Sequence, residues 1–365
     1  MKISRHLLPI CLLILPAINF ALVGCGGTNA GVAAASGLYV APIDLGVAQT
    51  SISGGGSNIV GLTAQGHFVA NTSSLTNSRF WSAPDGISQS LPKLGLNGHQ
   101  LQIMGVNGSD SISGTDLTAN PTRTVYWGSP TTSPATLLQF ATGEADFAVG
   151  INEAGGIVGG SSGTPGSGLY WTSLNNPPQK ILALSGDVGM RPTAISSSGH
   201  IIGISTTASL QSRSAYWANA DAQPVEIATA SSLTNVFTTG VDNGGQIVGG
   251  GKNSFGSNTA LIWAGPSVAP VSLPRFVAES SLTATNVQAI NNSGTAVGSA
   301  SVDDAGTQHA VIWRGGLIQD LNNLIPSGDW TLRSANFIND NGVIIGSGNR
   351  ADHPTVWKLF VIIPE

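Results

Sequence analysis

The sequence is poor in charge and in cysteine. Only 9% of its 365 residues are charged, and its two cysteines are Cys11 and Cys25. So few thiols exclude a disulfide-rich scaffold and a cysteine-based zinc site. The formal net charge is −5 and no basic cluster occurs, which argues against a nucleic-acid partner. Beyond residue 25 no amphipathic stripe continues at helical spacing, so a helical bundle is excluded as well.

Glycine and hydrophobic residues are abundant instead. The chain has 48 glycines, and 41% of its residues are hydrophobic, which is more than a disordered chain carries. Serine, threonine and asparagine are also frequent, as expected for a protein with many turns. We therefore expect an all-β exported domain that folds around its own hydrophobic core.

The first 25 residues have the layout of an export signal. Lys2 and Arg5 precede an apolar run of about 15 residues, shorter than the roughly 20 residues that a membrane-spanning helix needs. The run ends at "LVGC", with Cys25 as its last residue. We predict that residues 1–24 are a signal peptide and are not part of the fold.

The motif "LVGC" resembles the lipobox of bacterial lipoproteins. The resemblance implies that Cys25 is acylated and becomes the first residue of the mature chain, which is then anchored to a membrane. Gly26, rather than Asp, after the cysteine implies sorting to the outer membrane. Residues 25–36 then form a flexible tether of small residues. A plain secretory signal, in which Cys25 falls by chance, is the alternative.

Seven segments of the chain repeat one phrase, typified by "INEAGGIVG" from Ile151. A tryptophan follows each turn after 15 to 19 residues, and successive tryptophans are 44 to 50 residues apart. A period of this length indicates solenoids, propellers or arrays. The seven tryptophans are Trp81, Trp127, Trp171, Trp217, Trp263, Trp313 and Trp357.

The phrase predicts a tight β-hairpin. An apolar residue is followed by a short polar residue whose side chain can bond to the backbone two residues on. Three residues later comes a glycine, or Asp110 in the second unit, and these residue types tolerate a left-handed backbone. The polar residues are Thr63, Asn107, Asn152, Ser196, Asp242, Asn291 and Asn339, and the turn glycines are Gly66, Gly155, Gly199, Gly245, Gly294 and Gly342.

Each unit has room for four strands: the hairpin, a strand that ends in tryptophan, and a further short strand. Four-stranded units of this length are the blades of β-propellers, so residues 37–365 predict a seven-bladed, four-stranded antiparallel propeller. The last unit lacks a separate fourth strand, and "GLYVAPIDLG" at residues 37–46 precedes the first. We expect this N-terminal strand to complete the last blade and close the ring.

The segment "DLNNLIPSGDWTLRSANFINDNGVIIGSG", residues 320–348, resembles the terminal unit of the HAF repeat family of extracellular bacterial repeats. The family's His-Ala-Phe signature survives best as His309-Ala310-Val311. The resemblance covers all seven units, is strongest from Gly150 onward, and weakens in the first two. It implies an exported repeat protein and supplies no reaction or catalytic residue. A shorter similarity to kelch repeats, in "IVGGSSGTPGSGLYW", implies the same architecture.

Few residues stand out as candidates for chemistry. The seven repeated tryptophans are expected to pack between blades, each with its indole N–H on a nearby carbonyl. Trp330 falls in the connection between two units and is a candidate for the ligand-binding face, with packing under that connection as the alternative. His309 and His353 precede the tryptophan strands of two units and are further candidates. No histidines lie at metal-ligand spacing, so neither a metal nor a cofactor is expected.

Three functions are compatible with these features. The first is a lipid-anchored binding module of the cell envelope, whose ligand is an envelope protein or a glycan. Its variable loops before the tryptophan strands, together with the connections between units, would form the binding face. The second is a propeller enzyme acting on polysaccharide, whose carboxylates would gather in the funnel. The candidate carboxylates are Glu144, Asp146, Asp187, Glu279, Asp303, Asp304 and Asp329. The third is a passive structural protein of the surface matrix.

Overall fold

The computed structural model describes residues 39–49, 58–71, 78–83, 87–94, 99–137, 139, 141, 143–163 and 165–365. The predicted signal peptide, Cys25 and the predicted tether of residues 25–36 lie outside the described residues. Residues 37–365 form one compact unit. Within the described ranges, no helix has the length and hydropathy that crossing a bilayer requires.

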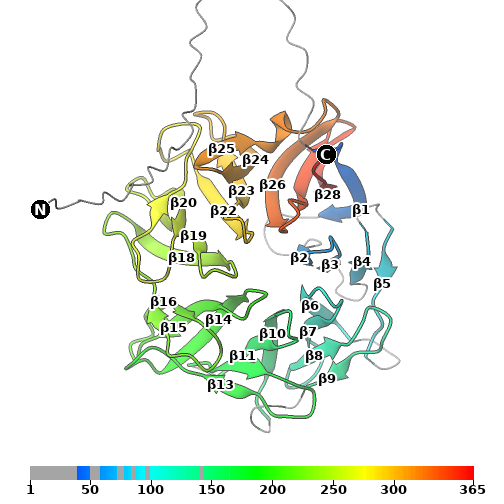
Figure 1. The fold of residues 1–365 in the computed structure, drawn as a ribbon, viewed down its shortest axis with the longest axis vertical. Coiled ribbons are helices and arrows are strands. Elements are labelled where there is room, and N and C mark those ends of the chain that lie inside the picture. The colour runs from blue at the N-terminus through cyan, green and yellow to red at the C-terminus, as the bar shows by residue number, and fades with distance from the viewer. Residues whose placement is uncertain are drawn as a thin grey trace, which may run out of the picture. The chain divides into compact units, whose positions relative to one another are not determined.

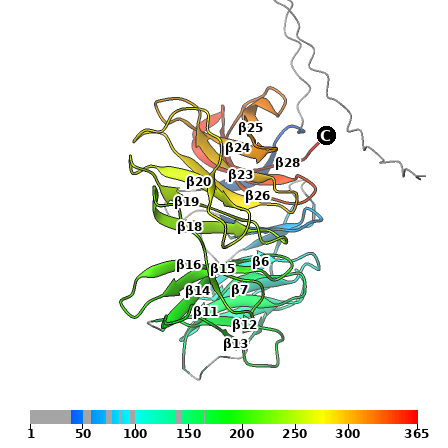
Figure 2. The same cartoon turned by 60° about the vertical axis from the view of Figure 1, so that its left-hand side comes forward.

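The described strands form seven four-stranded antiparallel sheets arranged in a ring, as Figures 1 and 2 show. Blade 1 contains β2 (Asn58–Leu62), β3 (Phe68–Asn71), β4 (Arg79–Trp81) and β5 (Gln89–Ser90). Blade 2 contains β6 (Leu101–Val106), β7 (Ile112–Asp116), β8 (Arg123–Trp127) and β9 (Ala135–Thr136). Blade 3 contains β10 (Asp146–Ile151), β11 (Ile157–Ser161), β12 (Gly168–Trp171) and β13 (Gln179–Ile181).

The remaining blades repeat this order. Blade 4 contains β14 (Gly189–Ile195), β15 (Ile201–Thr206), β16 (Ser212–Trp217) and β17 (Val225–Glu226). Blade 5 contains β18 (Thr234–Val241), β19 (Ile247–Lys252), β20 (Asn258–Trp263) and β21 (Val271–Ser272). Blade 6 contains β22 (Thr285–Ile290), β23 (Ala296–Ser301), β24 (Gln308–Arg314) and β25 (Leu317–Asp320), followed by the 3₁₀ helix η1 (Leu321–Asn323). Blade 7 contains β26 (Trp330–Ile338), β27 (Ile344–Arg350), β28 (His353–Ile362) and β1 (Ile43–Gln49).

The N-terminal strand closes the ring, as predicted. β1 pairs antiparallel with β28 and becomes the outer strand of blade 7 (Figure 1). Lys358 Nζ lies 2.7 Å from a carboxylate oxygen of Asp44, and the backbone N–H of Tyr39 donates to the carbonyl of Leu324 at 3.0 Å. Tyr39 is buried in a core cluster formed by residues of blades 6 and 7. Strands from both ends of the propeller therefore share one sheet, in which β1 takes the place of the missing fourth strand.

The repeated phrase forms the hairpin between the first and second strand of each blade. All six turn glycines have a positive φ, between 74° and 99°, and Asp110 has φ 59°. The short polar residue caps the turn from inside: the Oδ1 atom of Asn107 accepts hydrogen bonds from the backbone of Ser109 and Ser111. The predicted turn chemistry is confirmed.

The same hairpins also link each blade to the next, which the sequence did not indicate. The amide of Asn107 donates to the carbonyl of Asn152, and that of Asn291 donates to the carbonyl of Asn339, both at 3.0 Å. Asn339 closes the circle by donating to the carbonyl of Thr63 at 3.0 Å. Further bonds between neighbouring hairpins join the remaining blades, including that of Asn243 with Asn292 at 2.8 Å. In blades 2, 6 and 7 the polar residue of the phrase thus serves both the turn and the ring.

Replacing Asn339 with aspartate tests this second role. Asn339→Asp keeps the acceptor that caps the turn and removes the N–H groups that reach blade 1. Because the side chain is buried, we expect a loss of about 1–3 kcal/mol in the free energy of unfolding. Urea unfolding measures it. The control is Asn341→Asp, since Asn341 is exposed and its amide donates to the carbonyl of Ala64. Equal losses of stability for the two variants would contradict the role of the buried Asn339 side chain in linking blade 7 to blade 1.

Six of the seven repeated tryptophans pack between blades, as predicted. Trp217, for example, shares a core cluster with Val158 of the preceding blade, and its indole N–H donates to the carbonyl of Leu182 at 2.8 Å. Trp263 and Trp313 make the corresponding bonds to Ala228 and Pro274. In these blades the indole therefore fills the space between two sheets and satisfies a carbonyl of the earlier blade. The prediction of such a bond is not met at Trp81, whose buried indole N–H has no hydrogen-bond partner among the described residues.

Trp357 departs from this pattern, and its predicted role between blades is wrong. In the other blades the tryptophan pairs with the first apolar residue of the second strand, as Ile201 pairs with Trp217. In blade 7 that residue, Ile344, pairs with Ile362 instead. The turn before β28 is short, because Arg350 already pairs with His353, so the strand passes Trp357 and continues for five more residues. Ile362 takes the core position, and Trp357 is left only partly buried.

The first strand of each blade is innermost, and the strands converge where the sequence has small residues (Figure 1). A Cβ atom added to Gly105 would lie 3.3 Å from the Cα atom of Gly150, and one added to Gly150 would lie 3.1 Å from Ile195. Larger side chains would push neighbouring blades apart at this point. The close approach of neighbouring blades therefore explains why small residues occur here.

Candidate functional site

A cavity of about 690 Å³ occupies the centre of the ring. Its lining includes, from each blade, the inner-strand residue directly before the small residue, or before Phe337 in blade 7. These residues are Val60, Met104, Val149, Thr193, Thr239, Gln288 and Asn336. The wall is apolar over blades 1–3, carries hydroxyls in blades 4 and 5, and carries amides in blades 6 and 7. At this level of the channel, the polar side chains therefore come from blades 4–7 only.

A second cavity, of about 750 Å³, is formed by residues of blades 6 and 7, and we call it the amide cleft. It is lined by Ala284, Asn286, Gln288, Ser299, Thr307, Gln308, Arg333, Ser334, Asn336, Ser347, Asn349 and Trp357. Gln288 and Asn336 also line the central cavity, so the two spaces meet there. Thr307 belongs to the turn before a tryptophan strand, and Ala284 to a connection between blades, which places the cleft on the predicted binding face.

One cation stands among these neutral groups. Arg333 lies at a register shift between Leu332 and Ser334, where the bulge takes its side chain out of the regular ladder. Its guanidinium donates to the carbonyl of Gln308 and to Oδ1 of Asn349, both at 3.3 Å. None of the described residues that line the cleft is a carboxylate, and Arg333 makes no ion pair with any described residue.

The side chain of Asn349 holds Arg333 close to β28. Its oxygen accepts from Arg333, and its amide donates to the carbonyl of Val356 at 3.2 Å, one residue before Trp357. Gln308 is fixed from the other side of the cleft, because its amide donates to Ser301 at 2.6 Å. The carbonyl oxygen of the Gln308 side chain is buried and has no hydrogen-bond partner among the described residues. The cleft is thus built from side chains that are already positioned.

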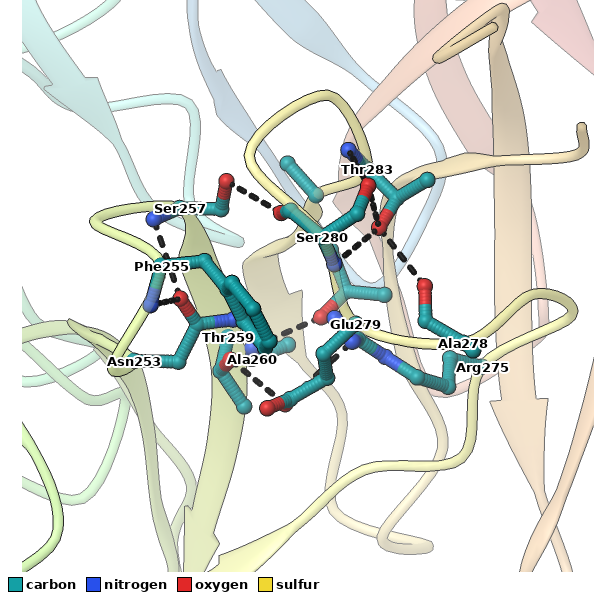
Figure 3. A network of polar contacts seen from close by, with 12 residues as sticks. Asn253, Phe255, Ser257, Thr259, Ala260, Arg275, Ala278, Glu279, Ser280 and Thr283 are labelled. Atoms are coloured by element: carbon teal, nitrogen blue, oxygen red, sulfur yellow. Dashed lines mark hydrogen bonds and ion pairs between the residues drawn. The ribbon is translucent and has the colours of Figure 1, made fainter. Parts of the chain in front are cut away.

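A network of polar contacts between blades 5 and 6 supports the rim of the cleft (Figure 3). The hydroxyl of Ser257 donates to the carbonyl of Ser280 at 2.7 Å, and Thr259 donates to the Glu279 carboxylate at 3.2 Å. Arg275 lies 3.2 Å from the same carboxylate. Asn258 donates to Asn286 of the cleft at 2.6 Å. The connection that follows blade 5 is therefore tied back to β20, and β20 is tied to the first strand of blade 6.

The three ligand-face candidates from the sequence lie elsewhere on blades 6 and 7, and none of them lines the amide cleft. Trp330 begins β26 and packs edge-on against Phe360, with ring centroids 6.0 Å apart. His309 lies on β24, with Nδ1 2.7 Å from a carboxylate oxygen of Asp320. His353 begins β28, is 60% exposed and has Asp352 at 4.0 Å. The structure does not bring the three together through any contact between them.

The pair of His309 and Asp320 predicts a pH-dependent contribution to stability. Burial raises the pKa of Asp320, but hydrogen bonds from His309 and Asn322 outweigh it and lower the pKa below its ordinary value. A lowered pKa stabilises the fold above the pKa of the unfolded chain, and this stabilisation is lost as the pH falls.

Asp320→Asn is therefore expected to cost about 1.5–3 kcal/mol at pH 7, and less as the pH drops below about 4. Urea unfolding of both proteins between pH 3 and pH 7 measures the difference. Asp304→Asn, at an exposed carboxylate, is the control. A difference that stays constant with pH would contradict the assignment.

The candidate carboxylates are held by their own neighbours. Asp187 binds Arg213 at 2.8 Å, Asp329 binds Arg350 at 2.7 Å, and Asp146 is 3.6 Å from Arg123. None of the seven lines either cavity, and Glu153 is the single carboxylate among the described residues that do. Glu153 accepts from the backbone N–H of Gly108 in the neighbouring hairpin. Among the described residues, no group of three or more histidine, cysteine, aspartate or glutamate side chains is placed to hold a metal ion.

The ring of seven four-stranded blades defines the class: the protein is a seven-bladed β-propeller. No protein-family model matches the chain, and no curated protein matches it. Among solved structures, it is similar to the β-propeller domain of the Trilobed protease from Pyrococcus furiosus. Identity is 11% over 84% of this chain and 93% of that domain, with a TM-score of 0.52.

A Mycobacterium tuberculosis peptidase that hydrolyses puromycin is similar to the same degree. Identity is 12% and the TM-score is 0.53, over 89% of this chain and 54% of that one. The chain thus spans about half the length of that peptidase. The archaeal domain is described as having an open velcro topology, whereas here β1 closes the ring on β28. Likeness at this level of identity establishes the fold alone.

Proposed function

We propose that the protein is a binding module of the bacterial cell envelope. Lipid on Cys25 would anchor it to the outer membrane, residues 25–36 would act as the tether, and the propeller would bind an envelope component. The amide cleft carries the proposal, because it combines a volume typical of ligand sites with several convergent polar groups and an aromatic side chain. The cleft also lies on the face with the connections between blades, where sequence can vary without disturbing the sheets.

The anchor part of the proposal rests on the "LVGC" motif, and membrane fractionation tests it. We expect the full chain, expressed in a Gram-negative host, to sediment with outer membranes, and its Cys25→Ser variant to be released into the soluble fraction. Mass spectrometry of the N-terminal peptide gives a direct readout of acylation. Equal sedimentation of both proteins, with an unmodified Cys25, would show that the signal is a plain secretory one.

The binding part is tested with the full chain extracted in mild detergent. Glycan arrays and purified envelope proteins are screened against it, with heat-unfolded protein as the comparison. We expect at least one defined component to bind saturably to the folded protein and not to the unfolded one. A screen without such a component would favour a passive structural role.

A further inference from the structure

We propose that the amide cleft is a subsite for an acidic carbohydrate, in which Trp357 carries a sugar ring and Arg333 binds its carboxylate. This inference rests on the proposed binding function and assigns its site and ligand class. Three independent features lead to it: an aromatic ring released from the core, a cation without an ionic partner, and a wall of neutral hydrogen-bonding groups.

The first feature is the position of Trp357. Its six counterparts are core residues, and four of them use the indole N–H on a carbonyl of the preceding blade, as Trp127 does with Pro92. In blade 7 that place belongs to Ile362, so Trp357 is not needed to fill the space between sheets. It lines the cleft and is partly exposed. A flat, apolar ring at the wall of a polar cleft suits the C–H face of a sugar, since both surfaces are removed from water on stacking.

The second feature is the charge of Arg333. The protein has a formal net charge of −5, yet the described lining of the cleft has one cation and no carboxylate. Arg333 uses its Nε and Nη1 atoms in bonds to neutral oxygens, and the guanidinium has five N–H groups in all. The remaining donors can form paired bonds with a ligand carboxylate, the geometry in which arginine binds carboxylates most strongly.

A second arginine extends this positive region along the ring. Arg191 of blade 4 occupies the same inner-strand rung as Asn286 and Ser334, because each pairs with the fourth residue of its second strand. Its guanidinium lies over the ring of Phe147, 5.2 Å from the centroid, and it makes no ion pair with a described residue. An acidic chain that runs from the cleft across the channel mouth would meet a second cation next to an aromatic ring.

The third feature is the neutral wall of the cleft. Asn286, Gln288, Gln308, Asn336 and Asn349 supply carboxamides, each with both donors and acceptors, and Ser299, Thr307, Ser334 and Ser347 supply hydroxyls. Sugar hydroxyls need partners that can donate and accept, which these groups provide. A peptide side chain would instead need an apolar pocket, and a nucleic acid would need several cations, in contrast to the single one among the described lining residues. The lining therefore fits a hydroxyl-rich ligand with an isolated negative charge.

Binding of defined oligosaccharides to the full chain in detergent tests the inference. The probes are galacturonate and alginate oligosaccharides, with dextran oligosaccharides as neutral sugars and polyglutamate as a carboxylate polymer without sugar rings. We expect calorimetry to detect the uronates and to show that affinity falls as salt is raised. Trp357→Ala and Arg333→Gln are each expected to weaken binding about tenfold or more, while Trp357→Phe and Arg333→Lys retain part of it.

Matched controls separate the cleft from general effects of charge and folding. Arg79→Gln removes the same charge from an arginine of blade 1 outside the cleft, and Phe255→Ala removes an exposed aromatic ring in blade 5. Both are expected to bind the uronates like the unchanged protein, and melting curves confirm that every variant is folded.

The outcomes distinguish this inference from the proposed function. If an envelope component binds but Trp357→Ala and Arg333→Gln bind it equally well, the proposed binding function holds and the assignment of the amide cleft as its site is wrong. If dextran binds as well as the uronates, or polyglutamate does, the acidic carbohydrate is the wrong ligand class. If neither a uronate nor any envelope component binds, both proposals fall together.

Discussion

Removal of residues 37–49 is expected to lower the melting temperature by about 5–15 °C. The deletion takes away β1, and with it the outer strand of blade 7 and the pairing that closes the ring. It also removes Tyr39 and Leu45, which are 3% and 4% exposed, and burial of such side chains stabilises a fold by about 1.5–3 kcal/mol each. The edge of β28 left behind would present unpaired backbone groups to solvent.

The control for this experiment is a chain that lacks residues 1–36 only and keeps the closing strand. We expect its melting curve, followed by circular dichroism, to match that of the full chain. A second comparison, Lys358→Gln, removes the 2.7 Å contact with Asp44 while keeping the strand. It should have a much smaller effect, since a partly exposed ion pair of this kind contributes about 0–1 kcal/mol. If the 37–49 deletion melts like the control, ring closure by β1 does not stabilise the protein.

The blade count and the hairpins could be predicted from the sequence because their causes are local, and the closing strand followed because the last unit lacks a fourth strand. A turn that needs a left-handed residue selects glycine at six units and Asp110 at the other, whatever surrounds it. The capping role of residues such as Asn107 follows from the same local geometry. Because the hairpin pattern occurs in seven units, the combined evidence for it outweighs the β-propensity of any single strand.

The position of Trp357 could not be predicted, because it depends on the register of a whole strand. The spacing from turn to tryptophan is 15 residues both in blade 1 and in blade 7. In blade 1 the tryptophan pairs with Phe68 at the start of the second strand, whereas in blade 7 the short turn at Arg350 shifts the strand by five residues. A difference in loop length of this kind leaves no mark in the tryptophan spacing itself.

The amide cleft could not be predicted from the sequence either, since its residues come from six strands, the turn between two of them and a connection between blades. One signal could have found part of it. At the inner-strand position of Gln288 and Asn336, the other five blades carry apolar or hydroxyl-bearing residues. The two amides therefore identify blades 6 and 7 as one side of the channel. Arg333 lies at a β-bulge, where an extra residue interrupts the alternation of side chains between the two faces of the strand. The direction of its side chain therefore could not be predicted from the sequence.

The paired glycines that gave a likeness to kelch repeats have a structural reason of their own. The second glycine leaves room for the side chain of a phenylalanine on the inner strand. A Cβ atom added to Gly160 would lie 2.9 Å from the ring of Phe147. One added to Gly250 would lie 2.9 Å from the ring of Phe237. Blades without that phenylalanine have a larger residue at the rung, such as Ile204 or Ser299. The first glycine of the pair is required for a different steric reason, which is common to all the blades from the second to the seventh.

Replacing that first glycine is expected to have a large effect on stability. Gly298→Ala should lower the free energy of unfolding by about 3–4 kcal/mol. Each inner strand shifts register next to this residue, and the shift brings its backbone against the second strand. A Cβ atom at Gly298 would overlap with the carbonyl oxygen of Asn286. The same overlap arises at Gly159 with Phe147 and at Gly346 with Ser334. Because the obstacle is backbone, no side-chain rotation relieves it, and the bulge itself would have to move.

Gly265→Ala is the matched control, since an added Cβ there meets no heavy atom within 4 Å and its φ is not left-handed. Alanine at that site should change stability by less than about 0.5 kcal/mol, measured by urea unfolding alongside Gly298→Ala. The comparison separates the steric cost at the bulge from the general gain of replacing glycine, which reduces the freedom of the unfolded chain. Equal stability of the two variants would mean that the inner strand can move without loss. The conserved spacing of glycine in "IVG" within this one chain would then need another cause than the bulge.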